Sequence, residues 1–244
     1  MRVVISQPTF FPWVGTFEKI RIADIYVHLD DVSFSKGGFT NRSLIKTPEG
    51  PRWLTVPVQG LHLGQRINEV RVDNRQDWRR RHIDVLAHQY RKARFRSDML
   101  GLVESVYSRS EWTLVSELSI GSIESVCAYF GLVPSRGFTR SSLIRASGAK
   151  SQKVLGIVKA LGGTTYICGA GNQRVKDRYL DHGTFEDRGI RIEYMNYLKV
   201  PYGQLHGPFT PMVSVLDLIA NEGQKGRAVF SSTAVHWRLK CESD

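Results

Sequence analysis

The sequence predicts an α/β fold, because short β-branched runs alternate with longer segments whose apolar residues recur at helical spacing. The first unit is a buried strand at 2–6, a helix at 13–23 and a second strand at 25–29. Strand, loop, helix and strand in this order open a parallel sheet with a right-handed crossover. With 244 residues, 41% of them hydrophobic, the chain has enough apolar material to bury such a sheet.

The pattern changes after the second strand. The elements predicted here are a loop at 32–44, strands at 52–58 and 67–72, and three helices between 76 and 130 with breaks near 97–98 and 108–112. The last helix should end at Gly131, since glycine is favoured where a helix terminates in a left-handed residue. These helices form an insertion in the α/β pattern.

A polar, Ser- and Arg-rich segment at 136–150 predicts a joint between an N-terminal region, residues 1–135, and a C-terminal αβ region, residues 136–244. The C-terminal elements are predicted as a helix at 151–161, a strand at 164–168, a helix near 173–182, a strand near 191–194, a loop at 201–211 and a helix at 213–220. We expect one compact unit: a Rossmann-like sheet with flanking helices, a helical insertion and a second αβ unit at the C-terminal side.

The net charge of +11 favours a polyanionic partner such as RNA, a nucleotide-linked substrate or an anionic lipid surface. Much of the excess lies on one predicted helical stretch. Its candidate nucleic-acid or phosphate contacts are Arg79, Arg80, Arg81, Arg91, Lys92 and Arg94. The alternative for this stretch is a solvated helix face with no ligand.

The cysteines and the hydropathy pattern indicate the compartment. Three cysteines without a CxxC spacing suggest neither a disulfide framework nor a metal site. No run approaches the roughly 18 apolar residues of a membrane span. We therefore expect a soluble cytoplasmic protein without a membrane span.

Residues directly after parallel strands are candidates for the site, because ligands bind at the carboxyl edge of such sheets. After the first strand, Gln7 and Trp13 belong to a proline-stiffened loop that enters a helix N-terminus able to attract an anion. The alternative is a rigid connector with aromatic packing.

Asp30 and Asp31 follow the second strand, and adjacent carboxylates of an extended chain point to opposite sides. At most one should therefore face a site, as a base, a hydroxyl-binding group or a magnesium ligand. Polar residues of the next loop and strand complete the group: Lys36, Asn41, Arg42 and Lys46. The alternative is that one aspartate forms a turn and the other a surface salt bridge.

A third group follows the strand at 164–168, where Gly169 and Gly171 let backbone amides approach a phosphate. This is neither a Walker A nor a GxGxxG motif, so no particular cofactor is indicated. Further along, Gln204 precedes His206, which lies in a loop and is our first choice among the histidines for acid/base chemistry. Cys168 is either a nucleophile or a small buried residue.

Segments in one order along the chain resemble the WbqC-like family. They are Ile5–Pro8, Pro12–Ile20, Ala23–Asp24, Leu29–Lys36, Asn41–Arg42, Ile45–Thr47, Trp53–Val58, Gly207–Pro211, Ser214–Leu218 and Asn221–Gly223. Gln7, the two aspartates at 30–31, Asn41, Arg42 and the substrate-binding candidate Asp217 fall on these segments. The sequence departs from the family pattern at Ser33, at Gly37–Gly38 and at Cys168–Gly171.

The resemblance implies a bacterial transferase of polysaccharide or natural-product biosynthesis that moves an acyl or aminoacyl group to an amine such as an amino-sugar. The anionic donor would be a nucleotide-sugar, acyl-CoA or aminoacyl-tRNA. Asp30, Asp31 or His206 would be the base, with Lys36, Arg42 and Lys46 holding the donor. The alternative function is a non-catalytic nucleic-acid-binding or regulatory protein in which the basic face is the function.

Overall fold

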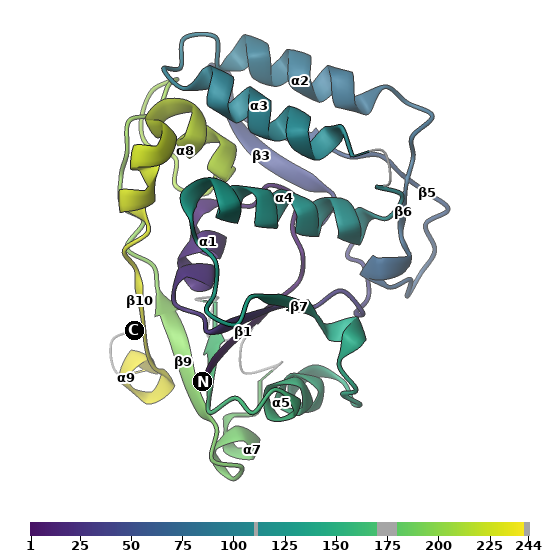
Figure 1. Cartoon of the computed structure of the whole chain (residues 1–244), viewed down its shortest axis with the longest axis vertical. Helices are drawn as coiled ribbons and strands as arrows, with labels where there is room; N and C mark the ends of the chain where they lie inside the picture. The colour runs from purple at the N-terminus through teal and green to yellow at the C-terminus, as the bar shows by residue number, and fades with distance from the viewer. Residues whose placement is uncertain (110–111, 170–179, 242–244) are drawn as a thin grey trace.

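A six-stranded sheet organises the chain, with strand order β10-β9-β8-β1-β2-β7 (Figure 1). In this computed structural model, residues 1–109, 112–169 and 180–241 are described. The strands are β1 Arg2–Ser6, β2 Ile25–His28, β7 Phe138–Arg140, β8 Thr165–Cys168, β9 Arg191–Asn196 and β10 Thr233–His236. Neighbouring strands pair in parallel except β10, which is antiparallel to β9. The predicted α/β fold with a Rossmann-like sheet is confirmed.

The chain winds outward from β1 in two directions. It goes first to β2 and β7 on one side, and later to β8 and β9 on the other. The order therefore reverses between β1 and β8, and the carboxyl ends of these two strands flank a topological switch point. Ligands of open α/β sheets bind in the crevice at such a point.

Helices cover both faces of the sheet. They are α1 Val14–Arg21, α2 Trp78–Gln89, α3 Arg96–Tyr107, α4 Val115–Phe130, α5 Lys150–Ala160, α7 His182–Glu186, α8 Val215–Glu222 and α9 Trp237–Cys241. Val4 of β1 packs into one core with α1, α4 and the helices beyond it, whereas Val3 and Ile5 pack into a second core with α5 and α7. None of the described helices is long and apolar enough to cross a membrane.

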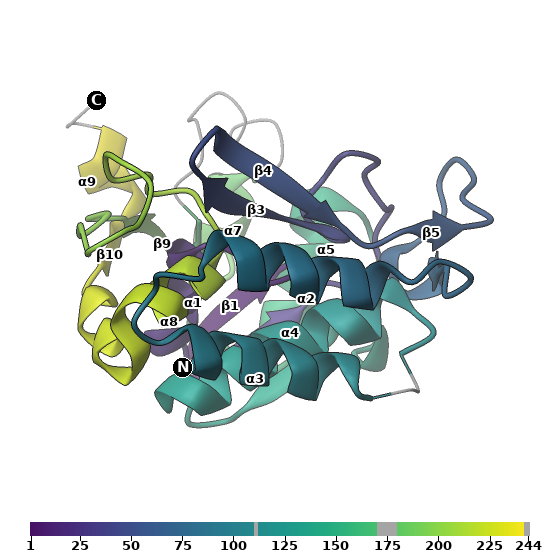
Figure 2. The same ribbon diagram turned by 90° about the horizontal axis from the view of Figure 1, so that it is seen from above.

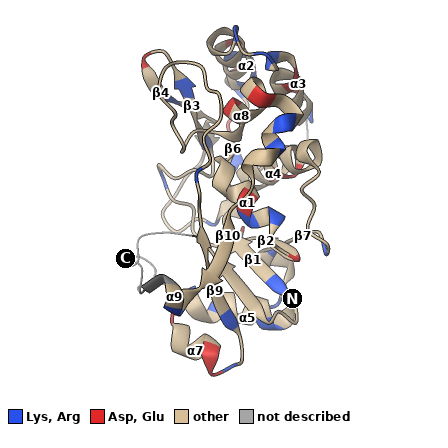
Figure 3. Cartoon of the chain, turned by 90° about the vertical axis from the view of Figure 1, so that its left-hand side faces the viewer, with Lys and Arg blue, Asp and Glu red and all other residues tan. Residues whose placement is uncertain are grey.

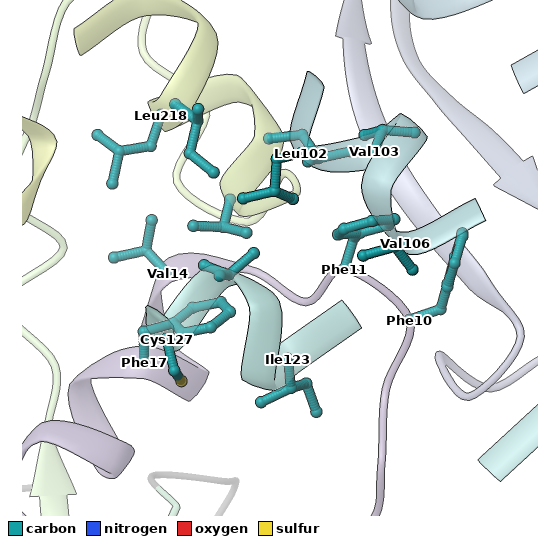
Figure 4. Close-up of a cluster of buried hydrophobic side chains, with 14 of the residues drawn as sticks. Phe10, Phe11, Val14, Phe17, Leu102, Val103, Val106, Ile123, Cys127 and Leu218 are labelled. Atoms are coloured by element: carbon teal, nitrogen blue, oxygen red, sulfur yellow. The ribbon is translucent and has the colours of Figure 1, made fainter. Parts of the chain in front are cut away.

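The larger core forms where the chain leaves β1. Phe10 and Phe11 are fully buried, and with Phe17 of α1 they meet aliphatic side chains of α3 and α4 (Figure 4). Burial of each such side chain contributes about 1.5–3 kcal/mol. The loop after β1 is therefore anchored on both sides of its polar residues, which holds the carboxyl edge of the sheet in place.

Two small antiparallel ribbons lie outside the main sheet. The hairpin consists of β3 Arg42–Thr47 and β4 Gly50–Thr55, and a second ribbon consists of β5 Val58–Gln59 and β6 Arg71–Val72. The predicted strand at 67–72 is wrong over its first half, where a 3-10 turn spans Ile67–Glu69. The Glu69 carboxylate accepts a hydrogen bond from the Arg66 amide (2.9 Å) and closes this turn, which competes with strand pairing.

The three helices predicted between 76 and 130 are confirmed as α2, α3 and α4, and α4 ends at Gly131 with φ 64°. The first break lies at 90–95 rather than near 97–98. The amide of Phe95 donates to the Ala220 carbonyl of α8 (2.8 Å), so a tertiary contact fixes this turn.

The polar segment at 136–150, predicted as a joint, contains β7, which pairs with β2. The sheet thus takes strands from both sides of residue 135. The predicted helices at 151–161 and 213–220 appear as α5 and α8, and the strands as β8 and β9. Most of the helix expected near 173–182 lies outside the described residues.

Two glycines in helix interiors should respond in opposite ways to the same substitution. A Cβ at Gly101 of α3 would meet nothing within 4 Å, whereas a Cβ at Gly121 of α4 would lie 2.7 Å from the Trp112 ring. We expect Gly101→Ala to raise the free energy of unfolding by up to about 1 kcal/mol. Gly121→Ala should lower it by about 1–3 kcal/mol through overpacking. Urea unfolding of both variants measures this, and equal effects would contradict the packing of Trp112 on α4.

Candidate functional site

A cavity of about 600 Å³ opens at the carboxyl ends of β1 and β8, at the switch point of the sheet. Ser6 and Gln7 line it where the chain leaves β1, and Cys168 and Gly169 line it where the chain leaves β8. Its size and place are those of a small-molecule site in an α/β protein.

Three lysines from two helices give the cavity a cationic wall. Lys19 belongs to α1, and its ammonium group donates to the Ser6 hydroxyl (3.0 Å). Burial lowers the pKa of Lys19, although the nearby Cys168 opposes the shift. Lys150 and Lys153 come from the first turn of α5, and Lys150 adopts a left-handed backbone (φ 51°) that is uncommon for lysine.

The buried Asp30 ties the end of β2 to the turn that follows β7. Its carboxylate accepts hydrogen bonds from the Ser142 amide (3.0 Å), the Ser142 hydroxyl (2.8 Å) and the Ser141 hydroxyl (3.1 Å). Three donors compensate for the removal of this carboxylate from water. Asp30 therefore has a positioning role in this structure, one step behind the cavity wall.

Asp31 extends this contact to α5. Its carboxylate lies 2.6 Å from the Lys153 ammonium and also accepts from the Ser141 hydroxyl. Burial acts to raise the pKa of Asp31, but the hydrogen bonds from Lys153 and Ser141 outweigh burial and hold the pKa below its ordinary value. We call Asp30, Asp31, Ser141, Ser142 and Lys153 the acidic junction, because together they join β2, β7 and α5.

Aromatic side chains form the opposite part of the lining. The rings of Trp13 and Tyr197 lie 5.0 Å apart at 58°. Tyr166 lies on β8 and is hydrogen-bonded to Cys168, so the thiol belongs to a polar group rather than to the apolar core. The cavity thus combines cations, an exposed glutamine at position 7 and flat apolar surfaces.

Other predicted substrate-binding residues gather in a second polar cluster outside the cavity lining. The buried ammonium of Lys46 donates to Gln204 Oε1 (3.0 Å) and to the Pro208 carbonyl (2.6 Å) of the loop at 201–211. Asp217 accepts from the hydroxyls of Tyr90 and Tyr202, each at 3.0 Å. Burial raises the pKa of Asp217, while these hydroxyls oppose the shift. The cluster fastens this loop between the β3–β4 hairpin and α8.

The remaining candidates from the first half of the chain also lie away from the cavity lining. His206 accepts or donates through Nε2 at 3.0 Å from the Gln89 carbonyl at the end of α2. Asn41 is buried and donates to the Val56 carbonyl (2.8 Å). Arg42 stacks on Trp53, and Lys36 is exposed in the loop before β3. Gly171 lies outside the described residues.

The predicted basic stretch lies on α2 and the turn after it, and Figure 3 shows basic residues there. Several of these cations have partners on the same helix or beside it: Arg80 pairs with Asp84 at 3.0 Å, and Arg79 donates to Asn74 Oδ1 at 2.8 Å. The cations of this stretch are Arg79, Arg80, Arg81, Arg91, Lys92 and Arg94, and the cavity lining includes none of them.

Sequence analysis missed the cationic wall, although one signal was present. Six of the eight residues of α1 are buried, yet the helix carries Glu18 and Lys19 side by side. Charged residues inside an otherwise apolar helix indicate a polar environment within the fold. Over residues 1–109, 112–169 and 180–241, no three His, Cys, Asp or Glu side chains gather as a metal ion would require.

The acidic junction predicts a pH-dependent stability difference. Asp31→Asn removes the partner of a mostly buried ammonium, so we expect the free energy of unfolding at pH 7 to fall by about 1–3 kcal/mol. Because the pKa of Asp31 is lowered by folding, its contribution is present above about pH 4 and is lost as pH falls through the folded-state pKa. The difference between the two proteins should therefore shrink below about pH 4.

The matched control is Asp84→Asn, which breaks the exposed pair with Arg80 on α2. This change should alter stability by less than about 1 kcal/mol at neutral pH. Chemical denaturation from pH 7 to pH 3 measures both variants. A loss for Asp31→Asn that matched the Asp84→Asn control would show that the acidic junction does not hold this edge together.

The chain matches the model of the WbqC-like protein family over residues 7–229. The uncharacterized protein Rv1507c of Mycobacterium tuberculosis is 30% identical over 224 residues, which cover 91% of this chain and 94% of the relative. No solved structure matches the chain. The matched region contains all three strand ends that meet at the cavity and the whole acidic junction. The chain therefore belongs to the WbqC-like protein family.

Proposed function

We propose that this protein is a transferase of polysaccharide or natural-product biosynthesis that moves an acyl or aminoacyl group from an anionic donor to an amine such as an amino-sugar. The observation that carries the proposal is the cationic wall of the cavity, where Lys19, Lys150 and Lys153 line one space with aromatic rings. Donors of this class include acyl-CoA, nucleotide-sugars and aminoacyl-tRNA, and all of them carry phosphate.

The parts of the cavity suit the two halves of such a reaction. The lysines would compensate the charge of the donor, because a phosphate needs cations when it leaves bulk water. The face formed by Trp13 and Tyr197 offers a flat surface on which a sugar ring or an acyl chain can pack. A space of about 600 Å³ holds a ligand of that size.

The reaction needs a group that accepts a proton. The amine nitrogen attacks the carbonyl carbon of the donor, the bond from that carbon to the donor oxygen or sulfur breaks, and the ammonium product gives up one proton. Lys19 is suited to take it, because burial lowers the pKa of Lys19 and thereby favours its neutral amine. Asp31 is a weaker base, since its bond to Lys153 lowers its pKa.

The test offers the purified protein charged tRNA, acyl-CoA and nucleotide-sugars, each with candidate amines, and follows the mass of the product. Lys19→Met should lower kcat about 100-fold through loss of the base. Lys153→Met should instead act on KM for the donor, because it removes a binding charge that is present in the ground state. Methionine keeps most of the lysine stem, so the packing changes little.

Lys159→Met is the matched control, since Lys159 is an exposed lysine of the same helix α5 and is not part of the cavity lining. It should leave kcat and KM unchanged. Absence of turnover with every donor and amine would contradict the proposal. The same holds if turnover is found and neither Lys19→Met nor Lys153→Met changes it.

A further inference from the structure

We infer that the β3–β4 hairpin, together with α2, forms a binding surface for single-stranded nucleic acid. The surface consists of Phe39, Arg42, Arg52, Trp53 and Arg81, and we call it the aromatic–arginine patch. It lies apart from the cavity lining, and binding to it does not require the transferase activity proposed above. Figure 2 shows the hairpin beside α2.

Two aromatic side chains are exposed where the hairpin begins. Phe39 is 50% exposed and Trp53 is 37% exposed, and their ring centroids lie 5.3 Å apart in an edge-to-face arrangement. A single exposed aromatic residue needs no explanation, but two in contact form a platform. Such platforms bind unpaired bases by stacking, largely independently of sequence.

The structure holds a cation in place on this platform. The Arg42 guanidinium carbon lies 4.0 Å from the centroid of the Trp53 ring, and its nitrogens donate to the carbonyls of Gly37 and Gly38. Stacking together with two hydrogen bonds fixes the side chain before any ligand arrives. A phosphate bound here would therefore cost little ordering of the arginine.

Two more arginines lie along a groove next to the aromatic rings. The groove has a volume of about 340 Å³, runs between β4 and α2, and is lined in part by Arg52, Trp53 and Arg81. Its carboxylate, Asp84, is paired with Arg80 at 3.0 Å, so the groove keeps a net positive charge. Both Arg52 and Arg81 are exposed and can meet phosphates that follow a stacked base.

This combination favours a single strand over other polyanions. A duplex keeps its bases stacked inside and would use only the arginines, and a small anion would use only the charges. The net charge of +11 supports the approach of a long polyanion. The Phe39 carbonyl accepts from the Phe10 amide (2.9 Å), and Thr9, one residue earlier, lines the cavity. A strand on the patch would thus have an end close to the cavity.

The test measures binding of a fluorescein-labelled 12-nucleotide single-stranded RNA to the full chain by fluorescence anisotropy, with the same sequence as a duplex for comparison. We expect the single strand to bind at least 10-fold more tightly than the duplex. Phe39→Ala and Trp53→Ala should each raise Kd about 5- to 100-fold through loss of base stacking. Trp53→Phe keeps a ring and should retain most of the affinity.

The arginines are tested through salt dependence. The double variant Arg52→Ala/Arg81→Ala should reduce the slope of log Kd against log salt by about two, one for each lost phosphate contact. The matched control is Lys159→Ala/Arg188→Ala, which removes the same charge from exposed positions of α5 and of the turn before β9. It should leave both Kd and slope unchanged.

Equal binding of duplex and single strand, or no effect of Phe39→Ala and Trp53→Ala, would overturn the inference. Circular dichroism confirms that each variant is folded, and the Trp53→Phe comparison separates stacking from a loss of structure. Failure of the transferase proposal gives a different result. RNA binding would then follow the predictions above while no donor is turned over, whereas failure of this inference leaves turnover of acyl-CoA intact.

Discussion

The removal of two adjacent carboxylates from water is the constraint on which the carboxyl edge of the sheet depends. A buried carboxylate is tolerated only when donors surround it. Asp30 receives them from the turn after β7, and Asp31 receives them from that turn and from Lys153 of α5. Because the partners belong to different elements, satisfying both carboxylates fixes β2, β7 and α5 together. The same contacts turn Lys153 toward the cavity, so the electrostatics of the site follow from the fold.

Local periodicity was sufficient to predict the elements that bury a full face. The strands β1, β2, β8 and β9 and the helices of the insertion follow from their apolar patterns. The strand β7 could not be predicted in this way, because its three residues are only half-buried and its pairing with β2 is entirely non-local. At Ile67–Glu69 the pattern suggested a strand, but a side chain capped a turn instead. Local hydrogen bonds that compete with a sheet leave no trace in hydropathy.

The site was predictable where it depends on topology. Gln7, Trp13 and Gly169 line the cavity because residues after parallel strands share one edge. Lys153 was missed because the acidic junction brings α5 to this edge, and no sequence spacing encodes that contact. Lys46 and Asp217 show the converse problem. Both are polar residues on segments shared with the family, yet they hold a loop, and sequence alone does not distinguish a buried structural network from a ligand site.

The central claim is that Lys19, Lys150 and Lys153 form one anion-binding wall. Nuclear magnetic resonance of the protein with ¹³C-dimethylated lysines, titrated with pyrophosphate, tests it most directly. Individual Lys→Arg variants assign the signals. If the claim holds, the signals of these three lysines move together with a single Kd and those of exposed lysines such as Lys159 stay in place. Shifts spread evenly over exposed lysines, or three cavity signals that do not respond, would contradict it.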